Sequence, residues 1–454
     1  MRVASSATGT MKPVNPLRNG LSMASGDLIK ASGKTLLTTA AVTGISLFTS
    51  VITARILGPE GRGLLSAAIL IGTLAAGISQ FGLANSFVFH RGAGRPFGYG
   101  YLLTTSLLFV CILAVLLAVM GLQFGSDNRL RDQFFLIAGF AGFLAAQNYL
   151  MTLSQLRAGL NFFNLLRFGL VFGNLVALLY VLAAFDSIDY RKILVSQLVV
   201  AGVLVFASLF WARRMLTRDA PSLKGETAKW RNILLYGVSH HGTVFLGIVL
   251  LNFDKIALLK IGTMVQYGFY ALAFSVSRLI GAVQEAVSTA LYARFAGRDL
   301  DQLSTGVKTA FRLTFLPMLV VAGTGALLSP WLIVMIFGAA FASMTVPFAI
   351  LLFECVVGGA SWILAQRFNA GGRPGLVFVR QFLSVLPIFI ALPFLPQQNI
   401  HIYLSALMFV GAVLRLTVTL ALYPMVLKQA IPRFLPTARD FRTLRTLLSG
   451  GGPI

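Results

Sequence analysis

The sequence predicts an all-α polytopic membrane protein with about twelve transmembrane helices in two six-helix lobes. The chain of 454 residues is 57% hydrophobic and only 11% charged, whereas soluble domains carry roughly 25% charged residues. Its apolar residues gather into runs of about 20, the length that crosses a bilayer. The net charge of +23 falls mainly on alternate connections between these runs, which is typical of membrane topology.

The elements follow from the chain in order. Residues 1–34 are polar and basic without the apolar core of a secretory signal, so we expect a cytoplasmic tail. Twelve apolar runs follow, at about 35–57, 64–86, 99–121, 134–154, 167–185, 193–211, 233–253, 264–291, 309–337, 345–365, 375–395 and 401–427. Pro317 and Pro330 predict a kink and an end within the ninth run.

The basic residues predict the orientation. If the N-terminal tail lies on the cytoplasmic side, 27 Lys and Arg lie on that inner side and 8 on the outer side. Both termini are therefore expected to be cytoplasmic. The predicted units are a lobe at 35–212, a basic cytoplasmic linker at 213–231, a lobe at 232–427 and a basic cytoplasmic tail at 428–454. Since topology explains the charge excess, no nucleic-acid partner is required. Residues 438–448 form either a basic amphipathic helix on the inner leaflet or a solvated tail.

A weak internal repeat supports the division into six plus six spans. Residues 54–67 and 257–271 both read aliphatic–basic–aliphatic, then Gly, a short polar link and a second Gly. Six helices are an even number, so the two halves share one topology. This parallel-repeat arrangement predicts a substrate path between the lobes.

Polar residues stripe the first two spans of each half. Gln80 belongs to the stripe of the second span, His240 to that of the seventh, and Arg278 and Glu285 to that of the eighth. Close packing between helices explains the small and hydroxylated members of these stripes. It does not explain the charges, each of which costs about 2.5–3.5 kcal/mol at the bilayer centre.

Four deep charges are therefore candidate functional residues. Arg278 and Glu285 are seven residues apart and nearly aligned on one helical face, while Glu354 and Arg415 lie in the tenth and twelfth spans. Either they form internal ion pairs, or they line a hydrated cavity for a charged substrate or a coupling ion. Glu285, Glu354 and Asp254 are the candidates for ion coupling, although Asp254 and Lys255 lie near a span end, where a local pair is expected.

Other kinds of function lack support in the sequence. Ser32-Gly33-Lys34-Thr35 resembles the end of a phosphate-binding loop, but Leu28 stands where that motif needs glycine. Two cysteines in apolar runs predict no disulfide, and the histidine spacing predicts no metal site. We therefore expect a protein without a cofactor or metal that is not an enzyme.

The motif Ala54-Arg55-Ile56-Leu57-Gly58-Pro59-Glu60-Gly61-Arg62-Gly63 resembles the first-hairpin signature of bacterial oligosaccharide flippases, the polysaccharide-transport branch of the multidrug/oligosaccharidyl-lipid/polysaccharide exporter superfamily. Asn252-Phe253-Asp254-Lys255 with Gly268-Phe269-Tyr270-Ala271, and Phe337-Gly338-Ala339-Ala340-Phe341, resemble later signatures of that family. That family usually has Arg before the Asp of the second signature, whereas Lys255 follows Asp254 here. The resemblance covers almost the whole chain.

The resemblance implies alternating access and a cavity lined by spans 1, 2, 7 and 8. It implies undecaprenyl-diphosphate-linked oligosaccharide as the substrate, moved from the inner to the outer leaflet of a bacterial inner membrane for capsule, exopolysaccharide or O-antigen synthesis. Cationic cavity residues of the family map onto Arg278 and Arg55. H⁺ or Na⁺ and polysaccharide-assembly proteins are further candidate partners. A cation-coupled multidrug exporter of the same superfamily and a membrane glycan polymerase or ligase are the alternatives.

Overall fold

The helices of the computed structural model follow the predicted spans closely. The structure describes residues 25–92, 99–125, 127–155, 161–219, 230–295 and 300–436. The first half comprises α1 (Ser25–Ile78), α2 (Leu83–Gly92), α3 (Tyr99–Phe124), α4 (Asn128–Arg131), α5 (Phe134–Ser154), α6 (Asn161–Ala184) and α7 (Tyr190–Asp219). The second half comprises α8 (Trp230–Ile261), α9 (Met264–Phe295), α10 (Leu300–Phe337), η2 (Ala339–Met344), α11 (Thr345–Asn369), α12 (Pro374–Ala391), η3 (Leu392–Phe394) and α13 (Ile400–Val426).

All regular structure in these described ranges is helical, and the protein is a multi-pass membrane protein. Nine helical segments of the described chain are long and apolar enough to cross a bilayer. That number counts α1 once and omits α8 and α9, which have 32 residues each. Polar residues lower the hydropathy of α9, although about 48 Å of helix is ample for a bilayer.

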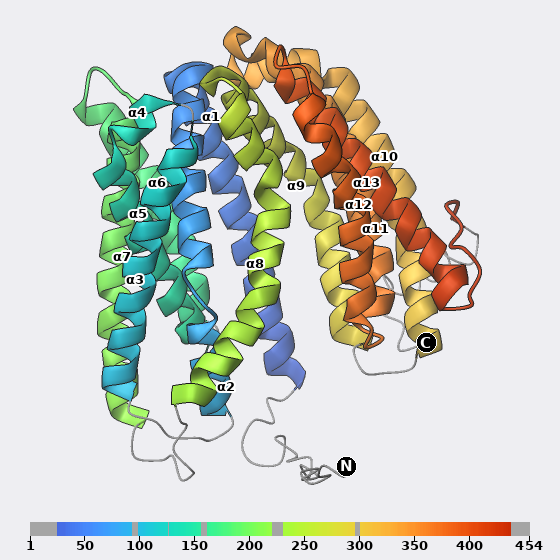
Figure 1. The fold of residues 1–454 in the computed structure, drawn as a ribbon, viewed down its shortest axis with the longest axis horizontal. Helices are drawn as coiled ribbons and strands as arrows, with labels where there is room; N and C mark the ends of the chain where they lie inside the picture. The colour runs from blue at the N-terminus through green and yellow to red at the C-terminus, as the bar shows by residue number, and fades with distance from the viewer. Residues whose placement is uncertain are drawn as a thin grey trace, which may run out of the picture.

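The first helix is a hairpin rather than one straight rod. Gly58 has φ 65° and ψ 180°, a left-handed conformation that glycine adopts without a steric cost, and Pro59 begins the returning arm. Figure 1 shows the two arms of α1 in blue, meeting at the end of the molecule drawn at the top. We call this end, which also holds the turn between α8 and α9, the hairpin end.

Two details of the predicted spans were wrong. The second span breaks before residue 86, because Phe81 (φ 45°) and Gly82 (φ 64°) leave the helical region and separate α1 from α2. Pro330 does not end the ninth span, since α10 continues through both of its prolines to Phe337. Packing against neighbouring helices makes interior prolines tolerable in membrane helices.

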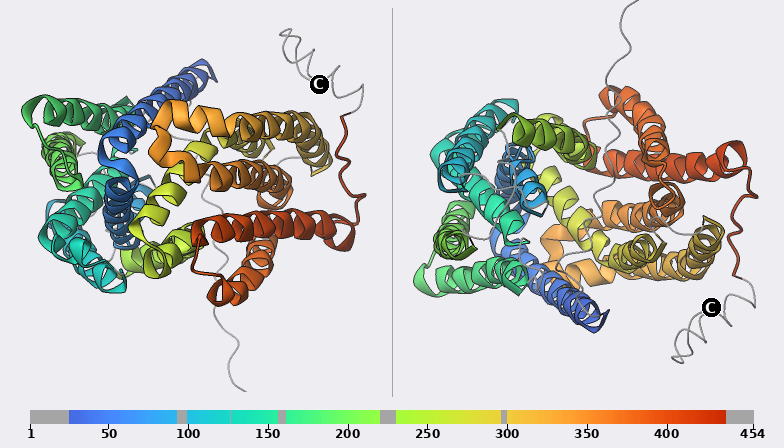
Figure 2. Two further views of the ribbon diagram at one scale, coloured as in Figure 1. Left: turned by 90° about the horizontal axis from the view of Figure 1, so that it is seen from above. Right: turned by 90° about the horizontal axis from the view of Figure 1, so that it is seen from below.

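The chain forms two lobes, with α1–α7 on one side and α9–α13 on the other (Figures 1 and 2). Their ribbons lie closest at the hairpin end and diverge toward the opposite end, while α8 crosses between them. The N-terminal tail before residue 25, most of the 213–231 linker and the 438–448 segment lie outside the described residues.

Glycines allow the lobes to meet at their backbones. A methyl group added to Gly63 would stand 1.9 Å from the carbonyl oxygen of Met264, and one added to Gly268 would stand 2.1 Å from that of Pro59. Away from this end, a methyl group on Gly82 would stand 2.3 Å from the carbonyl oxygen of Gly237 on α8. The two lobes are therefore in direct contact through α1, α8 and α9.

Candidate functional site

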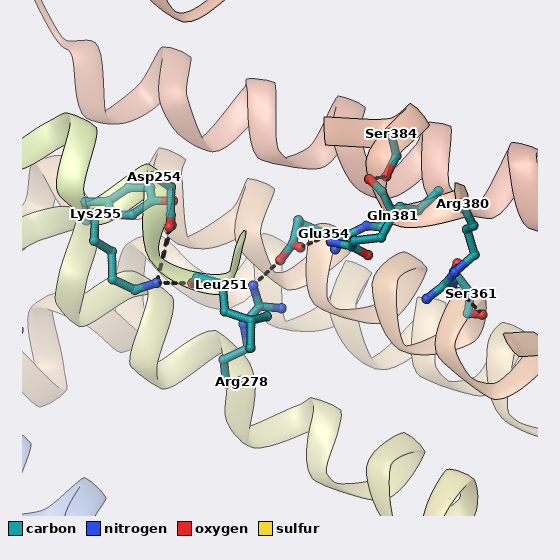
Figure 3. A network of polar contacts seen from close by, with 11 residues as sticks. Leu251, Asp254, Lys255, Arg278, Glu354, Ser361, Arg380, Gln381 and Ser384 are labelled. Carbon is teal, nitrogen blue, oxygen red and sulfur yellow. Dashed lines mark hydrogen bonds and ion pairs between the residues drawn. The ribbon is translucent and has the colours of Figure 1, made fainter. Parts of the chain in front are cut away.

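A network of charged side chains lies inside the second lobe, on α8, α9, α11, α12 and α13 (Figure 3). Its acidic members are Asp254 and Glu354, and its basic members are Lys255, Arg278, Arg380 and Arg415. We call these six residues the charge network. Because each position lies within a helix of the membrane bundle, every charge has lost most of its water and depends on neighbours for compensation.

Glu354 is the centre of the charge network. Its carboxylate lies 2.5 Å from a terminal guanidinium nitrogen of Arg278 on α9 and 3.3 Å from one of Arg415 on α13. The residue is only 2% exposed. Two arginines from two different helices thus share one buried carboxylate.

Close packing of α9 on α11 brings Arg278 to Glu354. A methyl group on Gly281 would stand 2.6 Å from Sγ of Cys355, and one on Gly359 would stand 2.1 Å from Oε1 of Gln284. Small residues at such contacts let membrane helices approach closely. The amide of Gln284 then donates to the carbonyl of Val356 at 3.1 Å, which fixes the register of the two helices.

Arg278 is the most accessible arginine of the charge network. Its side chain is 35% exposed, whereas that of Arg415 is 18% exposed. The guanidinium also lies over the ring of Phe274, 4.2 Å from the ring centre. Ser275 and Glu285 are exposed on the same side of α9, so Arg278 belongs to an open polar face of that helix.

Asp254 and Lys255 form a second group beside Phe274. Asp254 is fully buried, accepts a 2.6 Å hydrogen bond from the hydroxyl of Tyr270 and lies 3.3 Å from the amine of Lys255. The amine also donates to the carbonyl of Leu251 and lies 3.7 Å from the centre of the Phe274 ring. This is the local pair expected from the sequence, and Phe274 joins it to Arg278.

Arg380 carries a buried charge without a carboxylate. It is 2% exposed, and its guanidinium donates to the carbonyl and hydroxyl of Ser361 and to the hydroxyl of Thr419. Within the described chain no acidic side chain lies within ion-pair distance of it. Neutral acceptors satisfy some of its donors but do not cancel its charge.

The charge network therefore has four basic and two acidic residues, an excess of positive charge in a low-dielectric region. Such an arrangement favours the approach of an anion, and guanidinium groups match the geometry of phosphates and carboxylates. The described residues contain no group of His, Cys, Asp and Glu side chains suited to a metal ion.

The structure brings some of the predicted residues together and separates others. Arg278, Glu354 and Arg415 are in contact, but Glu285 is exposed and is absent from this cluster. Gln80 donates to carbonyls of its own lobe, at Ala76 and Ala145. His240 lies on α8, and its side chain is outside the described part.

Arg55 is at the hairpin end, away from the charge network. It donates to the carbonyls of Met335 and Ile336 at the end of α10, at 2.7 Å for the latter, and so joins the two lobes. Nearby, a pocket of about 510 Å³ is lined by Glu60, Asp127, Asn128 and Arg129 of the first lobe and by residues 262–265 of the second.

Polar contacts within the first lobe organise this pocket. Arg129 lies 2.9 Å from Glu60 and 2.8 Å from Asp127, and its hydrogen bonds lower the pKa of the Asp127 carboxyl. The side chain of Arg62, predicted to belong to the outer side, donates to Thr53 and Ser50 within the α1 hairpin.

Three residues of the site, Arg380, Tyr270 and Phe274, were not among those predicted from the sequence. Arg380 could have been identified from the sequence, because it is a charged residue within the predicted span 375–395. Tyr270 and Phe274 gave none, since an aromatic residue in a membrane helix is ordinary. Only the packing of α8 on α9 shows that these rings contact Asp254, Lys255 and Arg278.

Several solved structures of transporters have a similar fold. A multidrug-resistance MATE transporter of the MOP superfamily, in an inward-facing conformation, matches with a TM-score of 0.63 at 14% identity, covering 87% of this chain and 99% of that one. The protein has the fold of MOP-superfamily transporters. The lipid II flippase MurJ, in an inward closed conformation, matches with a TM-score of 0.62 at 12% identity, covering 91% and 90%.

A third transporter with this fold is the MATE protein VcmN of Vibrio cholerae, solved as a point mutant. It has a TM-score of 0.55 at 13% identity over 88% of this chain and 97% of that one. No protein-family model and no curated protein matches the sequence. The fold is therefore shared with both drug exporters and a lipid flippase, and it does not by itself decide a function.

Proposed function

We propose that the protein is an alternating-access flippase that moves a lipid-linked oligosaccharide across the inner membrane of a bacterium. Undecaprenyl diphosphate is the proposed lipid carrier, and Arg278 is its proposed contact. The observation that carries this proposal is the positive excess of the charge network, with Arg278 partly exposed at its edge. A diphosphate is an anion that a guanidinium can bind through two parallel hydrogen bonds.

Alternating access is supported by the arrangement of the lobes. They are in backbone contact at the hairpin end and diverge at the other (Figure 1). The match to a transporter solved in an inward-facing conformation has a TM-score of 0.63, against 0.56 for one solved in an outward-facing conformation. With the predicted topology, the hairpin end is the outer side, and the structure corresponds to an inward-facing state.

The alternative is a cation-coupled multidrug exporter, and the match to MATE transporters supports it. Such a protein would use an unpaired acidic residue for its cation. Glu354 and Asp254 are both paired with basic residues, which argues against this use. Glu285, which is exposed on α9, is the remaining candidate for the cation. The excess of arginine therefore favours an anionic substrate over a cationic drug.

The proposal predicts that Arg278→Ala abolishes translocation. A deletion strain would be complemented with the wild-type protein, with Arg278→Ala, or with Arg433→Ala as an exposed arginine after α13. Wild type and Arg433→Ala should restore lipid-linked oligosaccharide to the outer leaflet, and Arg278→Ala should leave it in the inner leaflet. The measurement is leaflet-specific labelling of the oligosaccharide with a membrane-impermeant reagent.

Full activity of Arg278→Ala would contradict the assigned role of this arginine. Normal leaflet distribution in the deletion strain, together with sensitivity to drugs, would favour the exporter. A change in glycan length without a change in leaflet would favour a polymerase or ligase.

A further inference from the structure

In the ion pair between Arg278 and Glu354, the arginine side chain is partly exposed and the glutamate side chain is buried. The Arg278 side chain is 35% exposed, whereas the Glu354 side chain is 2% exposed. The carboxylate therefore contacts the guanidinium from within the lobe, where α9 packs against α11. An anion that approaches Arg278 along the open face of α9 therefore meets a guanidinium whose charge is already neutralised by Glu354 on the opposite, buried side.

The ion pair with Glu354 does not use all of the hydrogen-bond donors of the Arg278 guanidinium. The ion pair joins one terminal nitrogen of Arg278 to one oxygen of Glu354, so it is not the two-bonded fork that arginine can form with a carboxylate. The ring of Phe274, 4.2 Å from the guanidinium carbon, gives the side chain a second support that does not depend on Glu354. The arginine can thus hold its position when the carboxylate moves.

Glu354 has another partner as well. Its second oxygen lies 3.3 Å from Arg415, whose side chain is 18% exposed. Loss of a partner is costly for a buried ion because it leaves a charge uncompensated. Here that cost is avoided, since Glu354 keeps Arg415 when it releases Arg278, and Arg278 gains the incoming anion.

We propose that Glu354 is an internal anion that competes with the diphosphate of the substrate for Arg278. This inference rests on the proposed function and deepens it. Without substrate, the carboxylate neutralises Arg278, and substrate binds only by displacing it. After translocation the carboxylate returns and helps to release the diphosphate. Glu354 thereby sets a weak affinity that suits a transporter, which must let its substrate go.

The competition has a measurable consequence. An internal competitor reduces the apparent affinity of a ligand by the fraction of time for which the site is free. If Arg278 is free for about a tenth of the time, removing the competitor tightens binding about tenfold. Glu354→Gln should therefore bind a diphosphate about ten times more tightly than the wild type.

The experiment measures binding of inorganic pyrophosphate and of a short-chain prenyl diphosphate to the full-length protein in nanodiscs. Glu354→Gln should bind both probes more tightly than wild type and should translocate substrate more slowly, because release is impaired. Asp186→Asn is the matched control, since it removes one exposed negative charge from the connection between α6 and α7 in the first lobe. It should change affinity less than about twofold, because an exposed charge is screened by water and salt.

A second variant separates competition from general electrostatics and protects against a misfolded first variant. Glu354→Asp keeps the charge and can retain Arg415, but the shorter side chain withdraws from Arg278. It should also tighten binding. Equal or weaker binding by both folded Glu354 variants, or an equal gain by Asp186→Asn, would overturn the competition.

Failure of the underlying function gives a different result. In that case Arg278→Gln would bind pyrophosphate as well as the wild type does, or wild type and Glu354→Gln would both fail to bind either probe. Binding by the wild type that is lost in Arg278→Gln but unchanged in Glu354→Gln would leave the flippase proposal standing and remove only the role of Glu354.

Discussion

At the scale of single residues, the interior of the second lobe has more positive charges than carboxylates to pair with them. Arg380 shows this most clearly, since it is 2% exposed and its neighbours are neutral, namely the oxygens of Ser361 and Thr419 and the ring of Trp362. Burying an unpaired charge costs several kcal/mol. Such a residue does not stabilise the fold, so its presence is better explained by the potential that it contributes to the site.

We predict that Arg380→Met weakens binding of a diphosphate without lowering thermal stability. Replacing a buried ion pair by apolar side chains is often neutral or stabilising by about 1–4 kcal/mol, and replacing Arg380 by methionine leaves no carboxylate without a partner. The melting temperature should be unchanged or higher, while the dissociation constant for pyrophosphate should rise several-fold. Thermal unfolding and binding assays on the same preparation measure both quantities. A large fall in melting temperature with unchanged binding would make Arg380 a structural residue.

The sequence predicted some of the deep charges, but it missed the buried Arg380, placed the exposed Glu285 among them, and did not show which charges meet. Arg278, Glu354 and Arg415 were identified because they interrupt apolar runs, and this signal needs no tertiary information. Arg278 and Glu285 share a side of α9, but Arg278 pairs across to Glu354 on α11. Periodicity along one helix describes its faces, whereas an ion pair between helices depends on their packing and register.

At the scale of elements, glycine contacts rather than ion pairs close the hairpin end. Gly63 and Gly268 leave no room for a side-chain carbon, because each would place it within about 2 Å of a carbonyl oxygen of the other lobe. The nearby ion pair of Arg129 and Glu60 joins two residues of the first lobe, so it does not hold the two lobes together. The repeat seen in the sequence placed a glycine after each hairpin, but it could not show that the two turns contact one another.

We predict that Gly268→Ala opens the hairpin end. The added methyl group would stand 2.1 Å from the carbonyl oxygen of Pro59, so the two backbones must separate. Spin labels at Asn128 and Thr263, which line the pocket from opposite lobes, should move apart in electron paramagnetic resonance distance measurements. Cys111 and Cys355 are first replaced by alanine so that only the intended positions are labelled.

Two controls accompany this measurement. Gly247→Ala adds the same methyl group on α8, where nothing lies within 4 Å, and should leave the distance unchanged. Arg55→Ala removes the side-chain hydrogen bonds to the carbonyls of Met335 and Ile336 on α10 and should separate the labels less than Gly268→Ala does. If Arg55→Ala separated the labels and Gly268→Ala did not, these hydrogen bonds would be the main closure.

At the scale of the whole molecule, the spans and the lobes were predictable, whereas the conformation was not. Runs of apolar residues and the distribution of Lys and Arg depend on the bilayer, which acts on every span independently. Which end of the lobes is closed depends on contacts such as that of Gly63 with Met264, between residues about 200 positions apart. A sequence that must form two conformations in turn does not reveal which one is more stable.

The predicted orientation places the hairpin end outside the cell membrane and the turn between α11 and α12 inside. Thr263 is in the α8–α9 turn, and Gly375 is the second residue of α12, where an added side chain meets nothing within 4 Å. In intact spheroplasts, a membrane-impermeant maleimide should label Thr263→Cys but not Gly375→Cys, and permeabilised cells should show labelling of both. The wild type, with Cys111 partly buried and Cys355 buried, should remain largely unlabelled. The reverse pattern would invert the topology, make the structure outward-facing, and reverse the direction in which Arg278 first meets its substrate.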